Sequence, residues 1–150
     1  MEYGTLERQV HIDASPEVVF EVLSRPEHLR RWWSDEAILE PAPGAVGELV
    51  WGDRETVSRI TVVDLDPPHR FSFRWSAPEN EPATPENSLL VTFDLEPSGT
   101  GTLLQLTETG FREMGWEIAV LEQQYQQHET GWDTFLPRLR TYAGSLVSPR

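Results

Sequence analysis

Large side chains recur in alternating steps of four and three over the last third of the chain, residues 116–146. The positions that share this spacing are Leu121, Tyr125, His128, Trp132, Phe135, Leu139, Tyr142 and Leu146. Such steps keep side chains on one stripe of an α-helix. The pattern therefore predicts a long amphipathic helix over residues 116–146. A glycine inside a helix costs about 1 kcal/mol relative to alanine, so we expect another segment to lie close to the backbone at Gly131.

The segment before residue 36 predicts one strand and two short helices. Residues 6–12 alternate apolar and polar side chains, as a half-buried strand does. Ser15 followed by Pro16 is typical of a helix N-terminus, with the serine as the cap and the proline in the first turn. A second short helix is expected over residues 27–33.

From residue 36 onward the apolar period changes from 3.6 to 2, which favours strands. We expect strands over residues 37–39, 46–51, 55–65, 70–76, 89–95 and 102–109. Consecutive strands with helices kept apart from them indicate an α+β fold. The prediction is a curved antiparallel sheet of about six or seven strands, wrapped around the long carboxy-terminal helix as one domain, 1–150. The proline-rich segment 77–87 is expected to be a surface loop, and a role as a lid stays open.

The composition excludes several classes of function. The formal net charge of −13 repels nucleic acids and anionic membrane surfaces. The sequence contains no cysteine and no lysine, which excludes disulfides, thiol nucleophiles and Schiff-base chemistry. The apolar runs are too short for a transmembrane helix, and the first residues lack a signal-peptide pattern. We therefore expect a cytoplasmic protein without nucleic-acid or membrane partners.

The four histidines do not have the spacing of metal ligands. They are His11, His28, His69 and His128, and the first three stand among polar residues where we expect them to be solvated. Neither a Gly-rich phosphate loop nor a nucleophile motif occurs in the sequence. We therefore expect no metal and no cofactor.

Three stretches together resemble the helix-grip superfamily, also called Bet v 1-like, START-like or SRPBCC. They are IDASPEVVF and PEHLRRWW (residues 12–20 and 26–33), DLDPPHRF (64–71) with Phe73 and Trp75 beyond it, and Gly131-Trp132 with Phe135, Leu136 and Leu139. Within the superfamily the chain is most similar to the family named for the carboxy-terminal domain of the Hsp90 ATPase activator. The resemblance implies the helix-grip fold described above.

Two departures from that family bear on function. Many relatives carry a histidine shortly before the position of Gly110, where this chain has Glu108, so no role of that histidine is transferred. The human co-chaperone has a further amino-terminal domain that engages Hsp90. Because five residues precede the first expected strand of this chain, we expect no such domain, and a co-chaperone role is less favoured.

The resemblance also implies a cavity between the long helix and the sheet. The residues most able to line it are Trp32, Trp33, Trp51, Phe73, Trp75, Phe93, Tyr125, His128, Trp132 and Phe135. Aromatic walls with a few polar groups are usual in small-molecule sites, although each ring could instead fill the core. We expect Trp132 and Phe135 to serve packing, and Trp32 and Trp33 to lie at the cavity mouth. Trp33→Ala should then weaken binding more than folding.

Two ionisable residues are weak candidates for catalysis. His128 lies on the apolar stripe and could bind a ligand or act as a general base, but a core histidine satisfied by a sheet residue is favoured. Glu108 shares parity with Leu104 and Leu106 and could face the cavity as an acid or base. For Glu108 a solvated position at the rim is favoured.

Three functions remain open. The first is a binding protein that holds a small apolar or amphipathic molecule in the cavity. The second is an enzyme of the cyclase or hydratase kind that uses the same cavity with His128 or Glu108. The third is a chaperone-related or stress-response interaction module, which would need an exposed apolar patch such as outward-turned Trp32 and Trp33. A homodimer is also left open.

Overall fold

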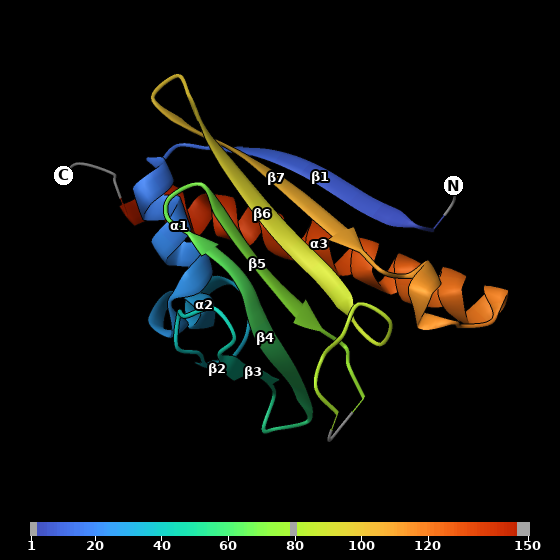
Figure 1. Ribbon diagram of the computed structural model, residues 1–150. Coiled ribbons are helices and arrows are strands. Elements are labelled where there is room, and N and C mark those ends of the chain that lie inside the picture. The colour runs from blue at the N-terminus through green and yellow to red at the C-terminus, as the bar shows by residue number, and fades with distance from the viewer. Residues whose placement is uncertain (1–2, 79–80, 147–150) are drawn as a thin grey trace.

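An antiparallel sheet of seven strands covers one side of a long helix (Figure 1). The structure is a computed structural model and describes residues 3–78 and 81–146. The strands are β1 (Thr5–Ile12), β2 (Glu36–Ile38), β3 (Val46–Trp51), β4 (Thr56–Asp66), β5 (Arg70–Trp75), β6 (Leu89–Ser98) and β7 (Gly101–Thr109). Their order in the sheet is β1-β7-β6-β5-β4-β3-β2. The first strand therefore pairs with the last, and the expected α+β helix-grip architecture is confirmed.

The helices are α1 (Pro16–Ser24), α2 (Pro26–Trp32), the short 3-10 helix η1 (Arg112–Met114) and α3 (Ile118–Leu146). The start of α1 is the expected one, because the Oγ atom of Ser15 accepts a hydrogen bond from the backbone N–H of Val18. The helices α1 and α2 close one end of the sheet beside the carboxy-terminal half of α3 (Figure 1).

The helix α3 is the long amphipathic helix that the spacing predicts, although it begins at Ile118. Its buried residues are Leu121, Trp132, Leu136, Leu139 and Ala143. The buried stripe thus includes two positions that lie beside the predicted ones. Leu146, the last predicted position of the stripe, is 45% exposed. The buried stripe therefore ends before the helix does.

Polar contacts fix the position of α3 against β1. The guanidinium of Arg8 donates to Asp133 at 2.8 Å and to Glu129 at 3.2 Å. The hydroxyl of Tyr125 donates to the carbonyl oxygen of Thr5 at 3.0 Å. The hydrogen bond from Arg8 lowers the pKa of the Asp133 carboxyl. These contacts set which helix residues face the sheet.

The inner face of the sheet is aromatic along β5. Phe71 and Phe73 are buried, and Trp75 on the same face is partly buried. On the neighbouring strands Val91 and Leu106 continue this face and are also buried. The core therefore lies between α3 and the middle of the sheet.

The expected strand boundaries differ most at the β6–β7 hairpin. The ladder continues to the pair Ser98 and Gly101, beyond the expected ends at residues 95 and 102. Gly99 has a φ of +60°, a conformation that glycine adopts without strain. This conformation allows a tight turn, so both strands extend further than expected.

The loop 77–87 includes residues 79–80, which lie outside the described residues, so its role as a lid stays a prediction. Near its carboxy-terminal end the backbone N–H of Thr84 donates to Asn87 at 2.7 Å. Arg59 of β4 donates to the carbonyl oxygen of Pro78 at 3.2 Å. Within the described residues, no helix is long and apolar enough to cross a membrane.

Candidate functional site

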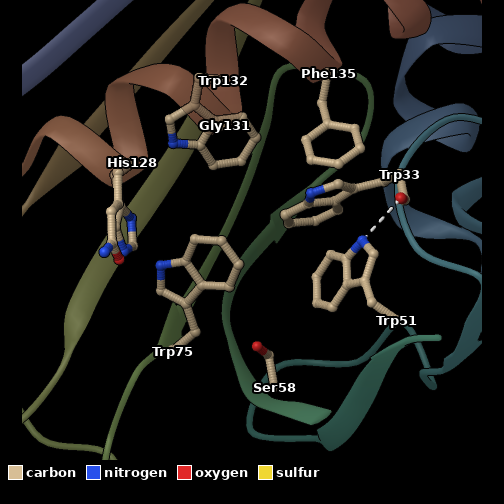
Figure 2. Close-up of a pocket in the computed structure, with 9 residues that line it drawn as sticks. Trp33, Trp51, Ser58, Trp75, His128, Gly131, Trp132 and Phe135 are labelled. Atoms are coloured by element: carbon tan, nitrogen blue, oxygen red, sulfur yellow. Dashed lines mark hydrogen bonds between the residues drawn. The ribbon is translucent and has the colours of Figure 1, made fainter. Parts of the chain in front are cut away.

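A pocket of about 230 Å³ opens between α3 and the sheet. It is lined by Trp33, Trp51, Ser58, Trp75, Gln127, His128, Gly131, Trp132 and Phe135. Figure 2 shows that four tryptophans approach it from four different segments. Trp33 follows α2, Trp51 ends β3, Trp75 ends β5 and Trp132 belongs to α3.

Trp33 is the centre of this tryptophan cluster. Its ring centroid lies 5.3 Å from that of Trp132, 5.4 Å from Trp75 and 5.9 Å from Trp51. The indole N–H of Trp51 donates to the backbone carbonyl of Trp33 at 3.0 Å, which ties the end of β3 to the end of α2 (Figure 2). Trp33 is only 6% exposed, so it is a wall of the pocket and part of the core at once.

Glu108 lies on β7 behind the pocket wall and is fully buried. Its carboxylate accepts hydrogen bonds from the indole N–H of Trp75 at 2.7 Å and of Trp132 at 2.9 Å. A third contact joins it to the Nδ1 atom of His128 at 2.9 Å. The expectation of a solvated glutamate at the rim is therefore wrong. Leu6 and Val91 stand opposite Glu108 on the two neighbouring strands and are also fully buried, so the strand order itself encloses it.

The two ring nitrogens of His128 differ: Nδ1 is held by Glu108, and Nε2 is open. Indole N–H groups only donate, so both oxygens of Glu108 act as acceptors. With Glu108 as a carboxylate, which has no proton to donate, its contact with His128 assigns a proton to Nδ1. The Nε2 atom has no hydrogen-bond partner within residues 3–78 and 81–146. The side chain is 15% exposed and lines the pocket. The favoured expectation was a core histidine satisfied by a sheet residue. A sheet residue does satisfy it, and that residue is an acid, but the side chain lines the pocket and is not wholly in the core.

Six of the ten residues expected to line the cavity do so: Trp33, Trp51, Trp75, His128, Trp132 and Phe135. The expectation that Trp132 and Phe135 serve packing alone is corrected, because both also face the pocket. The expected mouth position of Trp33 is wrong as well, since its indole lies at the centre of the cluster.

The remaining four expected residues do not line this pocket. Trp32 is 2% exposed, stacks on Trp33 and donates its indole N–H to the carbonyl of Val22 at 3.1 Å. Phe73 and Phe93 are buried beneath the tryptophans. Tyr125 is held near the end of β1 by Thr5. Depth in the core separates Trp32, Phe73 and Phe93 from the pocket, whereas Tyr125 is partly exposed beside β1. The spacing of apolar residues does not encode either difference.

Three lining residues were missed: Ser58, Gln127 and Gly131. Gln127 adjoins His128 and falls outside the apolar stripe, so its pattern indicates a solvated position. The expectation that a segment lies close to Gly131 is wrong, because an added Cβ there would meet no atom within 4 Å. The missing side chain instead leaves part of the pocket open, and an interior helical glycine was the available signal.

The expectation that three histidines are solvated holds for two of them. His11 and His69 are exposed, whereas the Nδ1 atom of His28 lies 2.7 Å from the hydroxyl of Tyr142 and is partly buried. Among residues 3–78 and 81–146, no three His, Cys, Asp or Glu side chains are grouped as a metal site.

Other hollows lack such a buried polar centre. One of about 300 Å³ lies between α1 and the turn at Pro67 and Pro68. Another of about 570 Å³ lies over β4 and β5 beside exposed charged side chains such as Arg70 and Asp66. Only the tryptophan pocket, among those of the described residues, has a wall backed by a fully buried carboxylate.

Comparison with known proteins gives a family and a set of similar structures. A family model described as "Activator of Hsp90 ATPase homolog 1-like protein" matches residues 13–144. No curated protein sequence matches the chain. Protein MLL2253 from Mesorhizobium loti has a similar structure, with a TM-score of 0.78 and 23% identity over 97% of this chain and 99% of that one.

Two further structures are similar. The Aha1 dimer from Colwellia psychrerythraea has a TM-score of 0.73 and 19% identity over 91% of this chain and 92% of that one. DynU16, from the dynemicin biosynthetic locus, has a TM-score of 0.71 and 21% identity over 93% of this chain and 46% of that one. At these identities the likenesses show the shared fold.

Proposed function

The chain belongs to the family of Activator of Hsp90 ATPase homolog 1-like proteins, and we propose that it binds a small apolar or amphipathic molecule in the tryptophan pocket. The observation that carries the proposal is the convergence of four tryptophans on an open volume of about 230 Å³. A concave, mostly aromatic lining with a few polar groups is the usual form of a small-molecule site.

The hydrogen bonds of the indoles define what the ligand meets. Three N–H groups are used within the protein: those of Trp75 and Trp132 by Glu108, and that of Trp51 by the carbonyl of Trp33. The pocket therefore offers ring surface to a ligand. The groups left for polar contacts are the side chains of Ser58, Gln127 and His128 and the indole N–H of Trp33, which donates to no residue of the described chain. A flat apolar body with one or two polar groups matches this lining.

The expected affinity is modest. An aromatic group of tryptophan size buries roughly 200–250 Å², and burial contributes about 25 cal/mol per Å². The resulting ~5–6 kcal/mol corresponds to a Kd on the order of 100 μM. Hydrogen bonds to the polar lining side chains would tighten this value.

The test is a calorimetric titration with 2-naphthol as the probe, on the wild type and two glycine variants. Gly131 and Gly144 both lie inside α3, and at both an added Cβ would meet no atom within 4 Å. Only Gly131 lines the pocket. Gly131→Leu should abolish binding because leucine fills the pocket, whereas Gly144→Leu should bind like the wild type. Equal binding by all three proteins, or none by the wild type, would refute the proposal.

A second candidate is an enzyme of the cyclase or hydratase kind, and the pairing of His128 with Glu108 favours it. A carboxylate that holds Nδ1 while Nε2 stays open orients an imidazole as a general base. The origin of DynU16 in a biosynthetic locus is compatible with chemistry on small molecules. This candidate requires that His128→Asn, whose amide reaches only the Nδ1 position, abolish turnover of a bound ligand while leaving its affinity within about threefold.

The third function, a chaperone-related module, has less support. It needed an exposed apolar patch, and the example considered, Trp32 and Trp33, does not supply one because they are 2% and 6% exposed. A homodimer is compatible with the dimeric Colwellia relative, and light scattering on the purified chain would decide it.

A further inference from the structure

We propose that the tryptophan pocket selects organic cations, such as a trimethylammonium group on a small apolar body, over neutral molecules of the same shape. The inference rests on the proposed function, because it names the class of ligand that the same pocket takes. Three observations carry it: the orientation of the indoles, the charge behind them, and the absence of a cationic arginine from the lining.

Trp75 and Trp132 turn their N–H edges away from the middle of the pocket. The polar N–H edge of an aromatic ring is its positive part, and the ring face is negative. In Figure 2 the nitrogen atoms of Trp75 and Trp132 both point to the side of His128, and their six-membered rings lie toward the middle of the pocket. Tryptophan is the strongest partner for a cation over a ring face. Four tryptophans thus present ring surface to one volume, and indole ring surface attracts an ammonium group.

The buried charge of Glu108 reinforces this preference. Two of its three partners are neutral indole N–H groups, and the third is the Nδ1 atom of His128. A buried carboxylate is ordinarily paired with a cation, but no arginine is among the hydrogen-bond or ion-pair partners of Glu108 in the described chain. The carboxylate therefore stands directly behind Trp75 and Trp132, with His128 and no guanidinium as its charged neighbour.

The nearby arginines are engaged elsewhere. Arg59 follows the lining residue Ser58 but donates to the carbonyl oxygens of Pro78 and Glu81. Arg74 precedes Trp75 and lies 3.5 Å from the hydroxyl of Ser88. The nine lining residues include no arginine. A bound cation would thus meet no like charge from these side chains.

The charge of the whole chain acts in the same direction. The chain carries 25 acidic and 12 basic residues, with a formal net charge of −13. A field of that sign raises the local concentration of cations and lowers that of anions. The titrations are set at pH 8.

The test compares three probes of one shape and different charge: 4-(trimethylammonio)benzyl alcohol, 4-tert-butylbenzyl alcohol and 4-(hydroxymethyl)benzenesulfonate. Calorimetry on the wild-type protein should give the cation at least about tenfold tighter binding than the neutral probe. The sulfonate should bind more weakly than either. Equal or tighter binding of the neutral probe would overturn the inference and leave the proposed function standing. Binding of none of the three would overturn both.

A pair of variants distinguishes attraction of the cation by an aromatic ring face from the fit of a ligand to the pocket shape. Trp51 is partly buried and ends β3 at the edge of the pocket, so Trp51→Phe keeps an aromatic face and Trp51→Leu keeps only an apolar one. The ratio of cation to neutral affinity should fall about threefold or more in Trp51→Leu and change less in Trp51→Phe. An equal ratio in the two variants would contradict recognition of the cation by ring faces.

Discussion

The Nδ1 atom of His128 on α3 lies 2.9 Å from the carboxylate of Glu108 on β7. The two residues join the long helix to the middle of the sheet at the place where Trp75 and Trp132 also meet the same carboxylate. A single acidic side chain therefore holds together three of the nine residues that line the pocket. Both the stability of the fold and the shape of the pocket therefore depend on Glu108.

Replacement of Glu108 by glutamine should destabilise the protein strongly. The amide offers one acceptor oxygen and turns an NH₂ group toward donors, so at least one indole or imidazole N–H stays unpaired. An unpaired buried polar group costs about 1–3 kcal/mol, and we expect a loss of ~2–3 kcal/mol in the free energy of unfolding in urea. Glu96→Gln, at an exposed position of β6, is the control and should stay within about 0.5 kcal/mol of the wild type. Equal effects of the two substitutions would contradict the network.

The proton of neutral His128 should reside on Nδ1. The carboxylate of Glu108 accepts there, while Nε2 has no partner in the described chain. Nitrogen-15 NMR of the imidazole at pH 8 distinguishes the two tautomers directly. A spectrum with the proton on Nε2 would exclude a general-base role for that atom, because the open nitrogen would then carry the proton. Exposed His69 is the internal reference, and it should show the ordinary tautomer mixture.

Gly131→Ala should stabilise the protein. Alanine is favoured over glycine in a helix by about 0.5–1 kcal/mol, and the added Cβ at this position would meet no atom within 4 Å. Gly144→Ala should give a gain of similar size for the same reason, and thermal unfolding measures both. A loss of stability confined to Gly131→Ala would mean that something contacts the backbone there, as the helical pattern alone predicts.

Trp33→Ala should damage folding, contrary to the expectation from sequence. Trp33 is in ring contact with Trp32, Trp75 and Trp132, and deletion of a buried tryptophan costs about 3–5 kcal/mol. Trp116→Ala is the matched control, because Trp116 is partly buried and does not line the pocket. Urea unfolding should show the larger loss for Trp33. A smaller loss for Trp33 than for Trp116 would contradict a core position and support the expected position at the cavity mouth.

The pair of Arg8 and Asp133 should make a small, pH-dependent contribution. Hydrogen bonding by Arg8 lowers the pKa of Asp133, so the pair stabilises the fold above the ordinary carboxyl pKa of about 4. That stabilisation is lost as the pH falls through the lowered value. Because the Asp133 side chain is 58% exposed, Asp133→Asn should cost less than about 1 kcal/mol at pH 7.

The difference between Asp133→Asn and the wild type should shrink below pH 4, as measured by urea unfolding at several pH values. Asp53→Asn, in the exposed turn after β3, controls for the loss of one negative charge. A difference that grows on acidification would mean that the folded state raises the pKa of Asp133, and would contradict stabilisation by Arg8.

Period and turn chemistry were sufficient for the fold. The steps of four and three predicted α3, the serine cap at Ser15 predicted α1, and the change of period to two predicted β5. The errors arise where depth matters. Glu108 was expected at the solvated rim and Trp33 at the cavity mouth, and both are buried.

The pocket was predicted only in part, for a physical reason. In the alternation of β7, Glu108 occupies a position that faces the core. Burial of a carboxylate without hydrogen-bond donors costs too much free energy, so a core position is predicted only if the donors can be identified. Those donors come from residues 20 or more positions away, at Trp132, His128 and Trp75. No local pattern links them, so their convergence became visible only in three dimensions.

The concentration of indoles around the pocket gives the protein an intrinsic optical signal. Four of its six tryptophans line the pocket, and Trp32 stacks on Trp33 with ring planes 12° apart. Most of the ultraviolet emission therefore originates within contact distance of whatever occupies that volume. Occupancy can be followed from the native chain by fluorescence quenching and near-ultraviolet circular dichroism, without any attached dye.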